Sequence, residues 1–217
     1  EFDLTDNTRK SDCPPMTFIR LGTSGGVHPD IAPDTLAISS YALGLDNTGL
    51  YYDEATVDEI VERIEIKAKQ ILTDAALNDS RFRGKIIPYA SKASIEITEA
   101  LTKQAAKHNV KFEVGITVSS PGFYGPSSRF IEGLKYTFPD IKGSLSRLEV
   151  DGLRVLNMEM ESSLFFHLCG QMGYRAGTIC TVISASTSSD DVVDYEAAIG
   201  NTIKIGLKTL VDLNKAS

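Results

Sequence analysis

An arginine inside an apolar run is the first feature of this sequence that could carry chemistry. Arg20 interrupts residues 16–21, which otherwise suit a buried strand, and Gly-Thr-Ser-Gly-Gly follows. A buried guanidinium is costly unless it meets an anion. The glycine-rich turn predicted at residues 22–26 offers backbone N–H groups and the hydroxyls of Thr23 and Ser24, which together could hold a phosphate. A tight turn beside a salt-bridged core arginine is an equally good interpretation.

Two glutamates, Glu159 and Glu161, stand two residues apart at a predicted strand-to-helix junction, with methionines interleaved. One carboxylate can accept hydrogen bonds from both hydroxyls of a ribose cis-diol, and its charge would favour a developing oxocarbenium centre. Acidic residues also interact favourably with the positive end of a helix macrodipole, so a structural role is the alternative for either residue alone. The pair with its methionines favours a binding site.

A loop rich in proline and glycine at residues 119–129 contains the adjacent aromatics Phe123 and Tyr124 and ends at Arg129. An aromatic ring could stack on a planar base, and the guanidinium could donate to its carbonyl oxygens. A surface loop anchored by one aromatic side chain is the commoner alternative.

Strands alternate with helices along the chain. Apolar runs predict strands and a helical spacing of apolar residues predicts amphipathic helices. Strands are expected at residues 16–21, 34–41, 110–119, 155–158 and 177–184, and helices at residues 57–72, 94–107 (with Ser94 as N-cap), 161–172 and 195–213. The alternation predicts a single α/β domain over residues 1–217, a sandwich with a central mixed, mostly parallel sheet flanked by helices. Ligands bind at the carboxyl ends of strands in such folds, where the three segments above fall.

Charge and composition argue against several other classes. The net charge of −7 disfavours nucleic acid as the main partner, because phosphate backbones need a basic face. No apolar run reaches the ~18 residues of a membrane span, and residues 1–10 carry no signal-peptide core, so a cytoplasmic protein is expected. Neither the cysteines nor the histidines have metal-ligand spacing, so no metal is expected; they are Cys13, Cys169, Cys180, His28, His108 and His167.

Taken in order, the three segments resemble the nucleoside phosphorylase family and, within it, the uridine phosphorylase branch. The matching motifs are residues 20–26, Phe123-Tyr124 with Arg129, residues 157–162, and residues 173–177 before the last strand. The Met-Glu-Met-Glu-Ser string is the most specific of them, and the resemblance covers nearly all of the chain from Phe18 onward. It implies a pentosyltransferase that cleaves uridine with inorganic phosphate to uracil and ribose 1-phosphate, in nucleoside salvage or catabolism.

The resemblance also implies a role for each candidate residue. Arg20 and Thr23 would bind phosphate, and Arg20, Glu161 and Arg129 would be catalytic, with Arg129 stabilising the leaving uracil anion. Ribose would be held by Glu159, Met160, Glu161 and Thr23. The base would be held by Ser24, Gly25, Phe123, Ser127, Arg129 and Ile183. No organic cofactor is implied, since inorganic phosphate is the co-substrate, and a homodimer or larger homo-oligomer is expected.

The chain departs from the family pattern in four places. Ser127 stands where the family has a glutamine two residues before the arginine, so a bidentate uracil contact would be lost. Ser184-Ala185 replaces the Ser-Asp of purine-specific members, and the arginine often found near Ser186 in uridine members is absent. The strands, glycine-rich phosphate loop and arginines that precede Arg20 in the family are also absent. This predicts a fragment or a reduced relative, with an unpaired sheet edge.

Two other functions stay open. A nucleosidase would use water in place of phosphate, although a hydrolase would gain nothing from an anion site at Arg20. A non-catalytic nucleoside-binding or storage-type relative would keep the scaffold alone. The intact Arg20, Thr23, Met160 and Glu161 oppose the second alternative, because loss of activity would be expected to spoil them.

Overall fold

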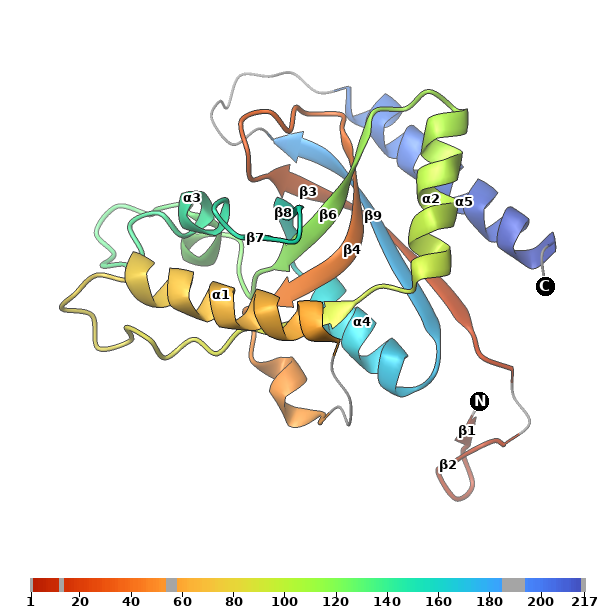
Figure 1. Cartoon of the computed structure of the whole chain (residues 1–217), viewed down its shortest axis with the longest axis horizontal. Coiled ribbons are helices and arrows are strands. Elements are labelled where there is room, and N and C mark those ends of the chain that lie inside the picture. Colours follow the sequence, from red (N-terminus) through yellow and green to blue (C-terminus); the bar gives the residue numbers. More distant parts are fainter. Residues whose placement is uncertain (1, 12–13, 54–57, 185–193, 216–217) are drawn as a thin grey trace.

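A curved mixed sheet forms the centre of the protein. The computed structural model describes residues 2–11, 14–53, 58–184 and 194–215. Five strands are neighbours in the order β3 (Thr17–Gly26), β9 (Arg175–Ser184), β4 (Leu36–Gly44), β6 (Phe112–Ser119) and β8 (Leu153–Glu159) (Figure 1). β3 runs parallel to β9, and β4, β6 and β8 run parallel to one another, while β9 and β4 meet antiparallel. The predicted α/β fold with a mixed sheet is confirmed.

The two outer strands of this order meet at their carboxyl ends. Gly25 pairs with Met158 and Gly26 with Asn157, so that β3 and β8 close the sheet partly on itself. This pairing brings the ends of the two chemically unusual strands together. Along residues 17–24, the other edge of β3 has no strand partner in the described part of the chain, which is the unpaired edge expected from the sequence.

Helices cover both faces of the sheet (Figure 1). α2 (Ile95–Lys107) and α5 (Tyr195–Lys215) lie side by side on one face, where α2 packs on β4 and β9, and α5 packs on β3 and β9. α1 (Glu59–Ala75) lies on the other face, against β4 and β6, and α4 (Ser162–Gln171) directly follows β8. The buried faces of α1 and α2 are the apolar stripes that their sequences predicted.

The last helix, α5, buries a different face from the one marked by its most apolar residues. Ile199, Ile203, Leu207 and Leu210 have the helical spacing of a core stripe, yet all four are exposed in α5. The buried face carries small residues instead, including Gly206, where an added Cβ would lie only 2.4 Å from Leu21 of β3. Close approach of α5 to β3 therefore selects the face with small side chains.

The predicted glycine-rich turn is also wrong, because residues 22–26 continue β3 as extended strand paired with β9 through Gly25. Their glycines permit close approach, since a Cβ on Gly26 would lie 3.0 Å from the carbonyl oxygen of Ile31. Ser94 is the N-cap residue of α2, as predicted, but its hydroxyl accepts from the Ala176 N–H (2.9 Å) instead of capping the helix.

Shorter elements were not foreseen. Each is only two to five residues long, too short for a hydrophobic period to show. They are the hairpin of β1 (Phe2–Asp3) and β2 (Thr8–Arg9), β5 (Tyr89–Lys92), β7 (Glu149–Val150), the 3₁₀ turns η1 (Thr48–Tyr51) and η2 (Gly125–Ser127), and α3 (Ile141–Leu145).

Several expectations about composition can be compared with the described residues. Cys169 and Cys180 are buried and free. Across the described ranges, no cluster of three or more histidine, cysteine or acidic side chains could hold a metal ion, and no helix has the length and apolarity to cross a bilayer. Cys13, Ala185 and Ser186 lie outside the described residues.

Candidate active site

A cavity of about 510 Å³ opens where β3, β8 and β9 end. These strands line one side of the cavity, which we call the strand wall. The loop at residues 120–129 lines the other side, which we call the loop wall. All of the candidate residues named from the sequence line it: Arg20, Thr23, Ser24, Gly25, Phe123, Ser127, Arg129, Glu159, Met160, Glu161 and Ile183. The fold therefore gathers the three segments at one place, while the role of each residue stays a prediction.

Arg20 lies between two carboxylates at the centre of the strand wall. Its Nη1 is 3.1 Å from Oε2 of Glu159, its Nη2 pairs with Oε2 of Glu161, and Nη1 also donates to Sγ of Cys180 at 3.0 Å. Burial alone would lower the pKa of Arg20, but Cys180 and the two carboxylates raise it, so the guanidinium stays charged. The salt-bridged arginine of the second interpretation is present, and Arg20 also lines the cavity, while its role in phosphate binding stays a prediction.

Glu159 is held on every side. Its side chain is 1% exposed, and Oε1 accepts from the Ser119 hydroxyl at 2.6 Å. The backbone N–H groups of Glu161 and Ser162 also donate to the carboxylate, at 3.1 Å each. Because these N–H groups open α4, Glu159 satisfies donors that the helix itself leaves unpaired. Glu159 therefore makes the contacts with the helix start that the structural alternative predicted, while its role in ribose binding stays a prediction.

The Glu161 side chain is more exposed than that of Glu159 and has fewer partners. Its side chain is 59% exposed, and Arg20 is the only partner of its carboxylate within the described residues. Met160 beside it is exposed to the same cavity. Thr23 is exposed on the facing strand, and its hydroxyl bonds no other described group. These three side chains are available to a ligand.

Two of the other candidates use their hydroxyls internally. Ser24 accepts from Nδ2 of Asn157 at 2.8 Å, within a buried network that continues to Thr117. Ser127 donates to the carbonyl oxygen of Gly122 at 2.8 Å. Their hydroxyls therefore hold the walls of the cavity, and a ligand would meet their backbone and Cβ atoms.

Phe123 and Arg129 form one unit on the loop wall. The Arg129 guanidinium lies over the Phe123 ring, 3.8 Å from its centroid, and Nη1 donates to the Phe123 carbonyl oxygen at 3.3 Å. Both side chains are exposed. A cation over an aromatic face gains from the ring quadrupole, so the two predicted base contacts support one another before any base is bound.

Comparison with known proteins decides the family. A family model described as the phosphorylase superfamily matches residues 10–211. The chain belongs to the phosphorylase superfamily. It is 26% identical to the uridine phosphorylase of Haemophilus influenzae over 92% of this chain and 65% of that protein. It is 30% identical to the uridine phosphorylase of Thermococcus kodakarensis over 80% of this chain and 50% of that protein.

A solved structure agrees with this assignment. The nucleoside phosphorylase of Trypanosoma brucei, whose description states that it shows uridine phosphorylase activity, superposes with a TM-score of 0.80 at 28% identity. The match covers 98% of this chain and 72% of the other. This phosphorylase-superfamily chain spans about half to two thirds of the length of the curated relatives. The family resemblance inferred from the motifs is confirmed.

Four cavity residues were missed in this superfamily member: Gly22, Met158, Ser184 and Tyr195. Three of them adjoin predicted residues, and Ser184 could have been found as the last residue of an apolar strand. Tyr195 begins α5 and reaches the cavity only through the tertiary fold, so no local signal marks it.

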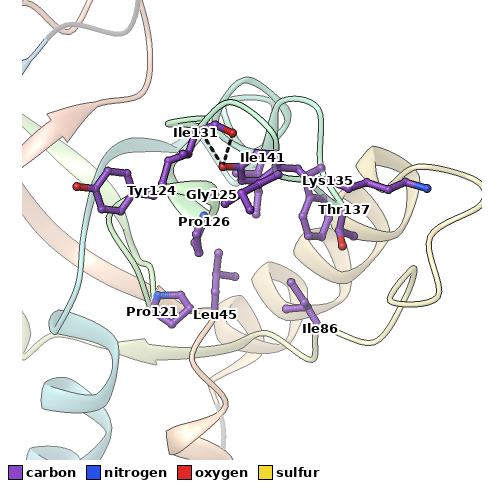
Figure 2. Close-up of a pocket in the computed structure, with 13 residues that line it drawn as sticks. Leu45, Ile86, Pro121, Tyr124, Gly125, Pro126, Ile131, Lys135, Thr137 and Ile141 are labelled. Atoms are coloured by element: carbon purple, nitrogen blue, oxygen red, sulfur yellow. Dashed lines mark hydrogen bonds between the residues drawn. The ribbon is translucent and has the colours of Figure 1, made fainter.

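A second cavity of about 390 Å³ lies behind the loop wall. Figure 2 shows Tyr124, Pro121 and Pro126 of the loop on one side of it, with Leu45 and Ile86 below. Tyr136 and Ile131 also line this cavity, and the Tyr136 hydroxyl accepts a hydrogen bond from the backbone N–H of Ile131 at 2.7 Å. The loop of this phosphorylase-superfamily chain therefore lies between two cavities.

Proposed function

We propose that this chain provides the nucleoside site of a uridine phosphorylase, a pentosyltransferase that converts uridine and inorganic phosphate to uracil and ribose 1-phosphate. The observation that carries the proposal is the Arg20–Glu161 pair, which faces the Phe123–Arg129 unit across one cavity. A cation for phosphate and a carboxylate for ribose thus lie on one wall, with an aromatic ring and a cation for the base on the other.

Substrate binding would replace one of the two carboxylate partners of Arg20. The guanidinium would turn from Glu161 to the incoming phosphate, with Thr23 donating beside it, and the freed carboxylate would accept from the ribose hydroxyls next to Met160. Glu161 can make this change because it is largely exposed, whereas the buried Glu159 would keep Arg20 in place. Binding of the two substrates would then be mutually supportive.

The reaction would follow from this placement. A phosphate oxygen forms the bond to C1′ as the C1′–N1 bond breaks, and the electron pair of that bond passes to the base. Glu161 would stabilise the positive charge that develops on the ribose, and Arg129 the negative charge on uracil. Holding both substrates in one cavity would supply much of the rate enhancement.

The wider setting is proposed on the same basis. We infer that the enzyme works in pyrimidine salvage and nucleoside catabolism, in the cytoplasm, as a homodimer or larger homo-oligomer. No organic cofactor is needed for this chemistry, and the small-molecule partners are the nucleoside and phosphate. The chain's acidic net charge supports a partner other than nucleic acid.

One observation favours a second candidate function. Arg20 is already neutralised by two carboxylates, which would weaken an anion site built on it alone. A nucleosidase that uses water would tolerate this arrangement, and so would a non-catalytic nucleoside-binding relative.

The test is release of uracil from uridine by the purified protein, with and without phosphate. Phosphate-dependent release supports the phosphorylase. Release without phosphate would assign the nucleosidase, and thermal protection by uridine without any release would assign the binding relative. Glu161→Gln should lower kcat/KM by about 100-fold or more, because a charged acceptor for the ribose is lost. Glu62→Gln, on the exposed face of α1, is the matched control.

A further inference from the structure

Lys142, in the short helix α3, places its ammonium beside Gly25, a residue that lines the cavity. Its Nζ lies 4.0 Å from the position that a Cβ on Gly25 would occupy, and Gly25 lines the cavity. The same position is 3.1 Å from the hydroxyl of Ser184, another lining residue. Lys142 itself is half-buried. Lys142 is far from Gly25 in the sequence, but its ammonium therefore lies close to Gly25 in the cavity wall.

The helix that carries Lys142 is tied to the loop wall. The backbone N–H of Lys142 donates to Oγ of Ser128 at 2.9 Å, and Ser128 adopts a left-handed conformation (φ 57°). Asp140 caps α3 by accepting from the Gly143 N–H at 2.8 Å. These bonds fix the start of the lysine side chain directly beside the residue that precedes Arg129.

The charge of the ammonium is only partly compensated by its surroundings. Among the described residues, Nζ donates no hydrogen bond and forms no ion pair. Burial lowers the pKa of Lys142, the nearby charge of Arg129 lowers it further, and Asp140 offsets only part of this. Two neighbouring cations at one end of a cavity, one of them half-buried without an acceptor, are unfavourable unless a ligand brings negative charge or carbonyl oxygens.

We propose that Lys142 is a second base-binding residue, whose ammonium donates to a carbonyl oxygen of the pyrimidine and, with Arg129, stabilises the leaving base. The inference rests on the proposed function and names the group that recognises its substrate. When the C1′–N1 bond breaks, its electron pair moves to N1 and spreads onto the carbonyl oxygens. Lys142 keeps its proton and stabilises that charge by a charge-assisted hydrogen bond.

This role explains how the site can lack the family's glutamine. Ser127 occupies that position, and its hydroxyl is engaged by the Gly122 carbonyl oxygen. A base held by Arg129 alone would leave one carbonyl unpaired, and a polar ligand group without a partner costs affinity. Lys142, whose backbone N–H is bonded to Ser128, supplies a second donor to the base from α3.

The experiment compares Lys142→Met with Lys103→Met in the full chain. Lys103 is an exposed lysine of α2 and lines neither the candidate active-site cavity nor the cavity behind the loop wall. Calorimetry with uracil and with ribose 1-phosphate separates the two halves of the site. Lys142→Met should weaken uracil binding by about tenfold or more, the usual loss for a hydrogen bond to a charged group. It should leave ribose 1-phosphate binding unchanged, and Lys103→Met should alter neither.

Two variants guard against a purely structural effect. Methionine matches lysine in length and removes the repulsion from Arg129, so the melting temperature should not fall. Lys142→Arg keeps the charge and should restore most of the uracil affinity. Unchanged uracil affinity in Lys142→Met, or an equal loss for both ligands, would overturn the assignment.

Turnover supplies the second readout. The 5-fluorouracil anion needs less stabilisation than the uracil anion, because fluorine withdraws electrons. Lys142→Met should therefore reduce kcat with uridine more than with 5-fluorouridine, whereas equal losses would contradict a charge-stabilising role. If the wild-type chain binds uracil but cleaves neither nucleoside, the proposed function fails and the calorimetry still decides the role of Lys142. If it binds no uracil, the Lys142 assignment fails as well.

Discussion

The two walls of the active-site cavity are built in different ways. The strand wall carries Arg20 and Glu159, which are fixed by an ion pair, a serine hydroxyl and backbone N–H groups from three adjoining elements. The loop wall carries Phe123 and Arg129, which contact one another and are exposed. Behind the strand wall is the buried sheet, and behind the loop wall is a second cavity.

This contrast separates two demands of the proposed reaction. Charge stabilisation at C1′ requires groups that are already in place when the reaction occurs, because reorganisation would raise the barrier. Base recognition tolerates adjustment, provided that donors reach the carbonyl oxygens. The strand wall therefore suits the ribose and phosphate chemistry, and the loop wall with α3 is where specificity can change with little effect on the fold.

The largest effect is expected from breaking the strand wall at Glu159. Glu159→Ala removes one of the two carboxylates that pair with Arg20, and it leaves the Ser119 hydroxyl and the first N–H groups of α4 without their acceptor. The free energy of unfolding should fall by about 3 kcal/mol, with loss of nucleoside cleavage. Urea denaturation measures the first and uracil release the second. Glu99→Ala, on the exposed surface of α2, is the control. A fall below ~1 kcal/mol would show that water replaces Glu159 easily, and that the strand wall is less rigid than its contacts indicate.

A smaller effect is expected from adding a contact to the loop wall. Ser127→Gln restores the amide that the family has at this position, and should strengthen uracil binding by less than about tenfold while Lys142 is present. In the Lys142→Met background the gain should be larger, because the amide then supplies the donor that the lysine provided. A double-mutant cycle in uracil affinity measures this coupling. Strictly additive effects would mean that the two side chains serve different atoms of the base.

The buried thiol of Cys180, which accepts from Arg20 of the strand wall, should make the free energy of unfolding depend on pH. Burial raises the pKa of the Cys180 thiol to about 12, above its ordinary value of 9.0. A folded-state pKa above the unfolded one gives stability that is complete below about pH 9 and is lost as the pH rises toward 12. The pKa of Tyr89 is also raised, to about 12, but from 10.0, so its loss begins later.

Cys180→Ala should therefore remove the part of the decline that begins near pH 9, as followed by urea midpoints from about pH 8 to about pH 10. The wild type and the variant would keep a common decline at higher pH, from Tyr89. Parallel curves over the whole range would show that the thiol titrates normally, and that the strand wall admits water.

The two walls also differ in how much of them the sequence could predict. Arg20, Glu159 and Glu161 stand out because charged residues are unusual in apolar strands, and the order of strands and helices was enough to place them at one edge. Lys142 carries no such signal, since it lies in a five-residue helix and reaches Gly25 only through the tertiary fold. The buried face of α5 could not be read from the sequence for a related reason: side-chain hydrophobicity marks Ile203 and Leu207, but backbone approach at Gly206 decides the packing.

The smallest effect is expected from filling the cavity behind the loop wall. Ile86 lines this cavity opposite Pro121 and Tyr124 (Figure 2). Ile86→Phe adds apolar volume there, which should change the free energy of unfolding by less than about 1 kcal/mol and restrict the loop. Because the loop carries Phe123 and Arg129 but not Arg20 or Glu161, uracil affinity should shift while ribose 1-phosphate affinity stays constant. Calorimetry with both ligands checks this, and Ile66→Phe, exposed on α1, is the control. An equal shift for both ligands would show that the walls move together, and that the difference in their construction does not reach ligand binding.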